Sequence, residues 1–382
     1  MSSLPTYFRD FLSEVRPTKS QLQDMRTGHS TLRRRLNEDD ELKPILVSDF
    51  LQGSYRRATA TRPLEAVRSD VDIIVVTNLD PRSVSPAQAM QQFVPFLEEH
   101  YEGKYRLQGR SIGIELSYVD LDLVVTAAPS EVDQKALAWA AVRASDTPEE
   151  VTDWRLNKLW VPMSERSLPG AMGRQLKAAE EASWKTEPLL IPDREASKWE
   201  PTHPLAQIEW TFEKSRATGG HFVNVVKCIK WWKKVNHASP KHPKSYPLEH
   251  LVGDCCPDSI GSVAEGVVLT FEEIRDRFAS YARAASTPYL PDRGVDQNVL
   301  KRISGEDFAR FHEHCSEAAD LARRAYDEDD LRSSAKLWRQ LLGEKFPEPP
   351  ASKGAGGSGP AILSGGFTER TDLRVPPRGR FA

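Results

Sequence analysis

The first regular pattern of apolar residues along the chain has the spacing of an α-helix. Between residues 18 and 36 the apolar positions recur at intervals of three and four, and Thr18 and Gln21 have the spacing of a capping box. The pattern predicts an amphipathic helix over residues 18–36. His29 lies on its apolar stripe, where we expect a packed ring without a role in binding. The other stripe residues are Leu22, Met25, Leu32 and Leu36.

A different pattern, of short apolar runs, follows. Runs of strand length cover residues 45–51, 71–77 and 112–125, separated by turn signals. One helical segment lies between them. It is expected to start at Ser85 and to reach His100, with a kink or an early break caused by the proline at position 95. This stretch therefore predicts a small sheet with helical cover.

Helical periodicity takes over beyond about residue 200, so we expect a second lobe that is mostly α-helical. Thr270 and Glu273 have the spacing of a capping box, and a final helix is expected from Asp330 to Gly343. Between residues 129 and 204 the pattern is mixed, and it predicts only a connecting region.

Three parts follow from these patterns. Residues 1–200 are expected to form an α+β core with an N-terminal helix, and residues 201–350 an α-helical lobe. From residue 351 the chain is rich in glycine and serine, which predicts a flexible tail over residues 351–382.

Composition restricts the kind of protein. The 382 residues include 52 Lys and Arg against 55 Asp and Glu, a formal net charge of −3, so any site for a polyanion must be local. No apolar stretch approaches the roughly 20 residues of a membrane span, and the first residues do not resemble an export signal. We expect a cytoplasmic protein with no membrane association. Its four cysteines are too few for a disulfide scaffold, so reduced thiols are expected.

The segment from residue 52 to residue 76 carries the most informative chemistry. Gly53 and Ser54 end one apolar run, where a glycine lets the backbone approach a ligand and a hydroxyl can hold phosphate oxygens. Asp70 and Asp72 open the next run. Because side chains alternate along a strand, both carboxylates lie on one face, where they repel each other unless a cation is present.

A second acidic alternation opens the strand at residues 120–125. If this strand neighbours the first, three or four carboxylates converge at one end of the sheet. Carboxylates combined with substrate phosphates are typical ligands of Mg²⁺, so we expect two ions, Mg²⁺ or Mn²⁺, to bind there. Asp70 and Asp72 are expected ligands, together with one or both of Asp120 and Asp122.

A basic segment follows in the second half of the chain. Residues 222–245 contain six lysines and no acidic residue, which predicts a local positive field. Lys227, Lys230 and Lys234 have the spacing of one helix face, and Ser245 opens the next helical segment. The alternative is a solvated basic helix with tryptophans in the core.

The chain resembles the polymerase β-like nucleotidyltransferases in its Gly-Ser pair, its two alternating aspartates and a further aspartate on a later strand. The lysine helix followed by Ser-Tyr resembles the oligoadenylate synthetases and cyclic GMP-AMP synthase. Residues 199–204 (WEPTHP), the segment LPDRGVDQNV from residue 290 and SAKLWRQLLGEKFP before the tail are similar to the bacterial cGAS/DncV-like nucleotidyltransferases (CD-NTases) of CBASS anti-phage signalling.

This resemblance implies a polymerase β-like α+β core, an α-helical lobe and a cleft between them. It implies that ribonucleoside triphosphates, ATP among them, are joined into a cyclic di- or trinucleotide with release of pyrophosphate. Asp70, Asp72 and Asp122 would be the catalytic metal ligands. The nucleotide would be held by Gly53, Ser54, Thr59, Lys230, Ser245 and, with less support, Lys227.

Arg56 and Arg57 would either touch phosphate or face water.

Two alternative functions remain open for the protein. One is a nucleotidyltransferase that acts on an RNA end or a protein hydroxyl, and the other is a catalytically silent nucleotide sensor.

Two further expectations concern partners. Some members of this branch are joined through a C-terminal small residue by machinery that resembles ubiquitin conjugation, and Ala382 would suit such a partner. Cyclic GMP-AMP synthase of animals carries a zinc-binding insertion, the zinc thumb, before its lysine helix. The residues that invite the comparison here, His250, Cys255 and Cys256, follow the lysine helix instead. Zinc and activation by DNA are therefore not expected.

Overall fold

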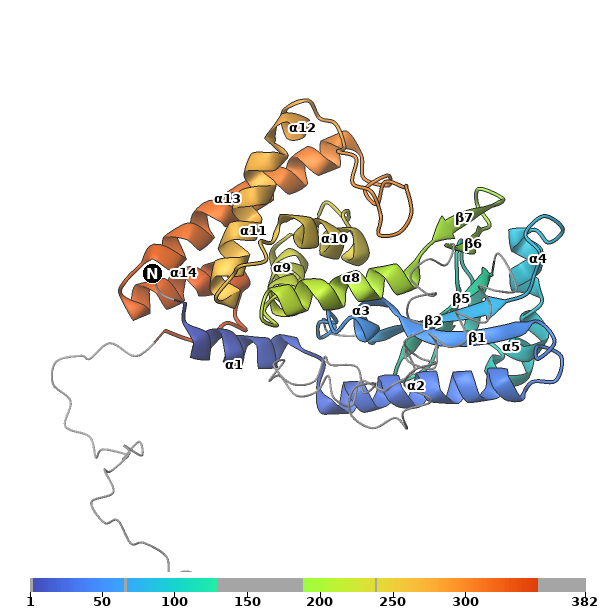
Figure 1. The fold of residues 1–382 in the computed structure, drawn as a ribbon. Helices are drawn as coiled ribbons and strands as arrows, with labels where there is room; N and C mark the ends of the chain where they lie inside the picture. Colours follow the sequence, from blue (N-terminus) through green and yellow to red (C-terminus); the bar gives the residue numbers. More distant parts are fainter. Residues whose placement is uncertain (1–2, 65–66, 129–187, 238, 350–382) are drawn as a thin grey trace, which may run out of the picture. The chain divides into compact units, whose positions relative to one another are not determined.

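The sheet lies in the first part of the chain. The computed structural model describes residues 3–64, 67–128, 188–237 and 239–349 (Figure 1). The described strands form one mixed sheet in the order β1-β2-β5-β4-β3, with β6 and β7 added beside β5. Their bounds are β1 Leu46–Gln52, β2 Asp70–Thr77, β3 Tyr105–Leu107, β4 Ile112–Glu115, β5 Asp120–Ala127, β6 Leu189–Asp193 and β7 Lys198–Thr202.

Strands β2 and β5 form the centre of this sheet. They pair in parallel, while β1 and β4 pair with them antiparallel. Alternate residues of β2, from Val71 to Val75, and of β5, from Leu121 to Val125, are almost completely buried in one apolar cluster. Because side chains alternate along a strand, the aspartates at the start of β2 and β5 lie on the face opposite these buried residues, as the sequence predicts.

Three helices cover the buried face: α2 (Lys19–Glu38), α4 (Pro86–Gln91) and α5 (Val94–Tyr101). The capping box of Thr18 and Gln21 is present, and the α2 stripe is buried, including the ring of His29. The segment expected to run from Ser85 to His100 is broken between α4 and α5, just before Pro95. The predicted break is thus confirmed.

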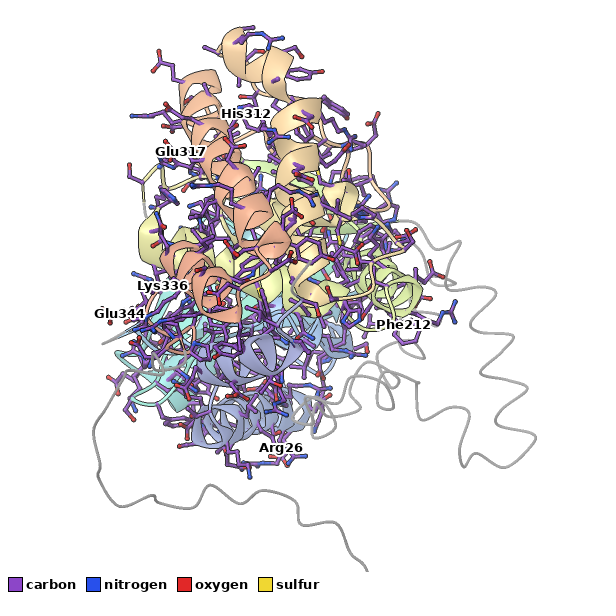
Figure 2. The ribbon with its side chains drawn as sticks, turned by 90° about the vertical axis from the view of Figure 1, so that its left-hand side faces the viewer. Arg26, Phe212, His312, Glu317, Lys336 and Glu344 are labelled. Carbon is purple, nitrogen blue, oxygen red and sulfur yellow. The ribbon has the colours of Figure 1, made fainter. Side chains whose placement is uncertain are left out.

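Beyond β7 the described chain is α-helical, as expected, and its buried side chains form a second large core. Helices α11 and α13 pack along each other, and the ring of His312 on α13 reaches the carbonyl oxygen of Arg275 on α11 at 2.8 Å (Figure 2). The helices are α8 Pro204–Ala217, α9 Phe222–Asn236, α10 Ser245–Cys255, α11 Val263–Arg277, α12 Ala279–Arg283, α13 Gly305–Asp327 and α14 Leu331–Leu342.

The N-terminal helix α1 (Pro5–Val15) belongs to this helical core, although it comes first in the sequence. The ring of Phe8 packs edge-on against Trp338, with ring centroids 4.9 Å apart, and against Phe346 at 5.3 Å. The predicted division at residue 200 stays a prediction, but the core that α1 joins is that of the helical lobe.

The expected capping box at Thr270 is wrong. Helix α11 begins eight residues earlier, where the Ser262 side chain accepts a hydrogen bond from the Glu265 N–H. Thr270 lies inside the helix, fully buried, and its hydroxyl donates to the Gly266 carbonyl at 2.6 Å. The final helix is as predicted, since α14 lies between an Asp330 N-cap and a Gly343 C-cap.

Several expectations fall on residues outside the described part of the chain. These are the tail over residues 351–382 with Ala382, and most of the connecting region between residues 129 and 204. Among the described residues, no helix combines the length and apolar character that crossing a bilayer requires.

Candidate active site

The two acidic alternations lie side by side. In the parallel ladder of β2 and β5, Asp70 is the partner of Asp120 and Asp72 is the partner of Asp122. Neighbouring strands lie about 4.8 Å apart, so the ladder brings four carboxylates to one end of two adjacent strands. The expectation that the two strands are neighbours is confirmed.

A pocket of about 180 Å³ opens beside this acidic end. Asp72 and Asp122 line it together with Ile74 and Val124, which follow them on the same face of the two strands. The pocket is therefore polar at its acidic end and apolar along the strands. Its remaining lining residues are Gln52, Arg110, Ser111, Ile191, Thr202 and Pro204.

The carboxylates perturb one another. Burial, and then the charges of Asp70 and Asp122, raise the pKa of Asp72 to about 7, while Arg57 opposes the shift. Burial and Asp70 also raise the pKa of Asp122, against a hydrogen bond from Ser111. A cluster of this kind binds protons or cations readily because either one relieves the repulsion.

Asp120 differs from the other three aspartates. Its carboxylate accepts a hydrogen bond from Arg68 Nε at 2.7 Å, so its charge is already compensated. Asp122 instead accepts longer bonds from Gln108 at 3.2 Å and Ser111 at 3.4 Å. The geometry thus favours Asp122 over Asp120 as a cation ligand.

The donor set of Asp70, Asp72 and Asp122 fits a hard divalent ion, because it supplies only carboxylate oxygens. As the side chains lie, no three His, Cys, Asp or Glu residues of the described ranges are close enough to form a ready-made metal site. An ion would have to draw the three carboxylates together, and the phosphates of a substrate would complete its ligands.

The Gly-Ser pair lies directly against the acidic pair. Gly53 has φ +75° at the start of the short helix α3 (Gly53–Arg56), and a Cβ at this position would overlap the Asp72 carboxylate. Only glycine fits so close an approach. The Ser54 carbonyl accepts from the N–H groups of Thr59 at 2.9 Å and Ala60 at 3.1 Å, which closes the turn after α3.

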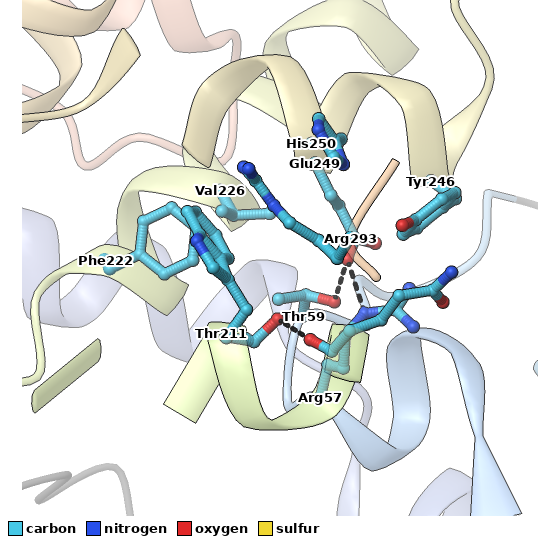
Figure 3. A pocket seen from close by; sticks show the side chains of 11 residues that line it. Arg57, Thr59, Thr211, Phe222, Val226, Tyr246, Glu249, His250 and Arg293 are labelled. Carbon is cyan, nitrogen blue, oxygen red and sulfur yellow. Dashed lines mark hydrogen bonds and ion pairs between the residues drawn. The ribbon is translucent and has the colours of Figure 1, made fainter. Parts of the chain in front are cut away.

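The residues after this turn meet the lysine helix α9 through one buried carboxylate, Glu249 on α10 (Figure 3). Its oxygens accept from Lys230 Nζ at 2.7 Å, from the Thr59 hydroxyl at 2.8 Å and from Arg57 Nε at 3.2 Å. Lys230 also donates to the Thr59 carbonyl at 3.1 Å. Arg57 is 3% exposed, so the expectation that it faces water is wrong.

The other predicted nucleotide ligands lie in different surroundings. Lys227 is buried on α9, where burial and then Arg16 and Lys230 hold its pKa well below the usual lysine value. Ser245 is exposed at the first position of α10. Lys234 donates to Thr61 and Arg62, both at 3.0 Å.

Sequence reasoning missed the polar network that surrounds Glu249. Gln207 on α8 hydrogen-bonds Gln52 at 2.8 Å, next to the Gly-Ser turn, and also Asp292, whose carboxylate accepts from the Tyr246 hydroxyl. One feature of the sequence could have indicated this network: Glu249 is a charged residue one helical turn after Ser245, among apolar neighbours, where a buried carboxylate needs polar partners.

Comparison with known proteins gives consistent matches. The family model of the Second Messenger Oligonucleotide or Dinucleotide Synthetase domain (SMODS) matches residues 1–133. A probable cyclic AMP-AMP-GMP nucleotide synthase of Salmonella paratyphi B is 47% identical over 99% of this chain and 100% of its own length. A cyclic AMP-AMP-GMP synthase of Enterobacter hormaechei subsp. hoffmannii (strain UCI 50) is 45% identical over the same shares.

Among solved structures, the Vibrio cholerae DncV cyclic AMP-GMP synthase, in complex with the linear intermediate 5′ pppA(3′,5′)pG, has a similar fold. Its TM-score is 0.63 at 12% identity, and the match covers 91% of this chain and 97% of that chain. The likeness in sequence and the likeness in fold therefore both extend over nearly the whole chain.

Proposed function

Because the chain belongs to the CD-NTase family of nucleotidyltransferases, we propose that it joins ribonucleoside triphosphates into a cyclic di- or trinucleotide second messenger and releases pyrophosphate. It has the polymerase β-like fold that the sequence predicts. The relatives at 45% and 47% identity are named for cyclic AMP-AMP-GMP, which favours ATP and GTP as substrates and a trinucleotide as product.

The observation that carries this proposal is the register of β2 and β5, which sets Asp72 beside Asp122 and next to Gly53. Asp70, Asp72 and Asp122 would hold two Mg²⁺ or Mn²⁺ ions, which supply activation of the attacking hydroxyl and stabilisation of the pyrophosphate leaving group. The protein contributes a turn whose backbone approaches the reacting phosphate and a pocket that places the acceptor nucleotide.

We assign the triphosphate to the basic side of the site. Lys230 and Ser245 would contact its oxygens, with Ser54 on the opposite side. Thr59 would support the site indirectly, because its hydroxyl donates to Glu249 and its carbonyl accepts from Lys230, and Lys227, also buried on α9, is assigned no direct contact. Lys230 would have to share its ammonium group between Glu249 and a phosphate. A lysine has three N–H donors, which makes such sharing feasible.

Substitution of the acidic pair tests the activity. Purified protein is incubated with the four labelled ribonucleoside triphosphates and Mg²⁺ or Mn²⁺, and phosphatase-resistant products are identified by mass spectrometry. Asp70→Asn and Asp72→Asn should each reduce product about a thousandfold or more, because the transition-state charge loses its stabilisation. Asp120→Asn is the matched control and should retain most activity.

Other results would identify a different reaction. Label on RNA or protein, without a small cyclic product, would indicate a nucleotidyltransferase with a macromolecular acceptor. Full activity in folded Asp72→Asn protein would contradict the assignment of the site. Absence of any product with either metal would favour a silent nucleotide sensor or a missing activator.

Metal binding has a separate test that does not depend on turnover. Mg²⁺ should raise the melting temperature of the wild-type protein by a few degrees, since an ion that binds only the folded state stabilises it. Asp72→Asn should abolish this rise, and in the absence of metal it should melt above the wild type because a repelling charge is gone. Asp120→Asn should keep the rise. An equal effect of Mg²⁺ on all three proteins would contradict a site at Asp72.

The same proposal extends to the setting of the enzyme. We expect it to act in the cytoplasm, in the CBASS anti-phage signalling of the CD-NTases, without double-stranded DNA as an activator. Conjugation at Ala382 by a ubiquitin-like system belongs to this proposal as well. Mass spectrometry of the protein purified from its host would detect a modified C-terminal peptide.

A further inference from the structure

Glu249 is a buried carboxylate that joins three separate segments of the chain. The geometry points to Glu249 as a positioning residue that sets the Gly53-Ser54 turn against the lysine helix α9 and so shapes the site for the donor triphosphate. This inference rests on the proposed function, because it assumes that the turn and Lys230 hold phosphate. Glu249 itself does not touch the nucleotide in this arrangement.

The link from Glu249 to the turn is short and direct. The Thr59 hydroxyl donates to Glu249 Oε2 at 2.8 Å, and the Thr59 N–H donates to the Ser54 carbonyl at 2.9 Å. Thr59 is 1% exposed. Thr59 therefore links the Glu249 carboxylate to the backbone of Ser54, the residue beside Gly53.

The link from Glu249 to the helix is equally direct. Glu249 Oε1 accepts from Lys230 Nζ at 2.7 Å, and Lys230 also donates to the Thr59 carbonyl at 3.1 Å. The carboxylate, the lysine and the threonine thus form a closed ring of interactions across α9, α10 and the turn. Figure 3 shows the side chains of Thr59 and Arg57 directed toward Glu249, with dashed lines that mark the two interactions.

Charge explains why a carboxylate is needed here. Arg57 and Lys230 both lie against Glu249, and the Glu249 side chain is 6% exposed. Without the negative charge these two buried cations would repel each other, and water could not screen them. The carboxylate leaves a net charge of +1 on the three groups, so the site remains attractive to phosphate after the turn has been fixed.

Nucleotide binding tests this inference without requiring turnover. A non-hydrolysable ATP analogue with Mg²⁺ is titrated into full-length wild-type protein and into Glu249→Gln, and calorimetry gives the dissociation constant and the stoichiometry separately. Glutamine keeps the size but places an N–H group against Lys230 or Arg57. Because the loss of one hydrogen bond to a charged group weakens an interaction by about tenfold or more, we expect the dissociation constant to rise about tenfold with the stoichiometry unchanged.

The matched control is Glu272→Gln. Glu272 also pairs with an arginine of the helical lobe, Arg323, through two contacts of 2.8 Å, but it lies on α11 and is not among the residues that surround Glu249 in Figure 3. This variant should bind the analogue like the wild type. A merely structural role for Glu249 would lower the stoichiometry, which counts folded sites, and would leave the dissociation constant of the remaining sites unchanged.

Substitutions of Thr59 keep the inference testable if Glu249→Gln does not fold. Thr59→Val removes the hydroxyl at constant shape and should weaken binding, whereas Thr59→Ser should restore it. The double variant Glu249→Gln with Thr59→Val should bind no more weakly than Glu249→Gln alone, because both changes break one link.

The outcomes separate this inference from the proposed function. Unchanged affinity in both Glu249→Gln and Thr59→Val overturns the positioning role, whatever the protein synthesises. Weakened affinity in a protein that makes no cyclic product overturns the proposed reaction and leaves the positioning role standing. A wild-type protein that does not bind the analogue overturns both.

Discussion

The pKa of the Glu249 carboxyl group is set by the two cations that lie against it. Burial alone would raise its pKa, but Lys230 and then Arg57 outweigh burial and lower the pKa from its ordinary value of 4.5 to about 2. The ionised form is therefore preferred in the folded protein. The stabilisation that it provides is fully present above pH 4.5, and it is lost as the pH falls through about 2.

This linkage predicts a pH-dependent difference in stability. The free energy of unfolding of the wild type should exceed that of Glu249→Gln by roughly 3 kcal/mol near pH 7, as expected for a pKa lowered by this amount. The difference should shrink as the pH falls below 4.5, because protonated glutamate resembles glutamine. Urea unfolding of both proteins at pH 7, 4 and 3 measures it. A difference that stays constant over this range would contradict the depressed pKa.

At the residue scale, sequence reasoning found the residues whose pattern is local. Asp70 and Asp72 alternate within one strand, so period two places both on one face, whereas Gly53 lies 17 positions before Asp70 and was linked to them by the family resemblance. Glu249 and Arg57 are far apart in the sequence, and nothing near either residue reveals the partner. Arg57 was therefore expected to contact phosphate or solvent, whereas the structure buries it against a carboxylate.

At the scale of elements, α2 contains a glycine where the helix meets the sheet. Gly28 is buried, and a Cβ at this position would lie 2.6 Å from Val119 Cγ1 and 3.3 Å from Leu121 Cδ2. Glycine usually destabilises a helix by about 1 kcal/mol relative to alanine. Here α2 packs so closely on Val119 and Leu121 that alanine, although the better helix former, would not fit at this position. These two residues lie around the start of β5, the strand that carries Asp122.

Gly28→Ala should therefore destabilise the protein by about 1–3 kcal/mol, the typical cost of overpacking, despite the better helix propensity of alanine. Val119→Ala should relieve the overlap, so that the double variant loses less than the sum of the two single changes. Thr27→Ala, on the exposed side of α2, is the control and should be neutral or stabilising. Urea unfolding of the four variants measures these effects, and additive losses would argue against the overlap.

The start of a helix could be predicted from the sequence where a single capping pattern preceded the helical periodicity. The helices α2 and α14 are examples. In α11 two segments share the same capping pattern, Ser262 with Glu265 and Thr270 with Glu273, and propensity cannot choose between them. The choice depends on tertiary packing, because Thr270 is fully buried inside the helix and cannot stand at its end.

At the scale of the whole molecule, the segment WEPTHP (residues 199–204) and the segment LPDRGVDQNV from residue 290, which resemble the CD-NTases, connect the sheet to the helical lobe. Glu200, in the segment WEPTHP, accepts from Arg110 beside the pocket and from Lys301 at 3.0 Å, which follows the segment LPDRGVDQNV. The Glu200 side chain is 7% exposed, and Lys198, which also pairs with it at 3.0 Å, is 59% exposed. The buried carboxylate thus holds cations from separate parts of the chain.

Glu200→Gln should lower the free energy of unfolding by about 2 kcal/mol, because the hydrogen bonds from the cations to a buried carboxylate are lost while the cations themselves stay partly exposed. Lys198→Gln, which removes an exposed partner, should cost less than about 1 kcal/mol. Urea unfolding at low and high salt compares the two variants. A loss in Glu200→Gln no greater than that in Lys198→Gln would show that the carboxylate is not a structural link.

The packing of Phe8 against Trp338 and Phe346 has a consequence for biosynthesis. Helix α1 precedes every other described helix in the sequence, yet the residues that its apolar face packs against, on α9 and α11 and at Trp338 and Phe346, all lie in the second half of the chain. The core of the helical lobe, with the lysine helix in it, can close only after these residues have been translated. A nascent chain that already contains Asp70, Asp72 and Asp122 therefore lacks the helical lobe that carries Lys230, and under the proposed function synthesis of the messenger would begin only after α14 has been translated.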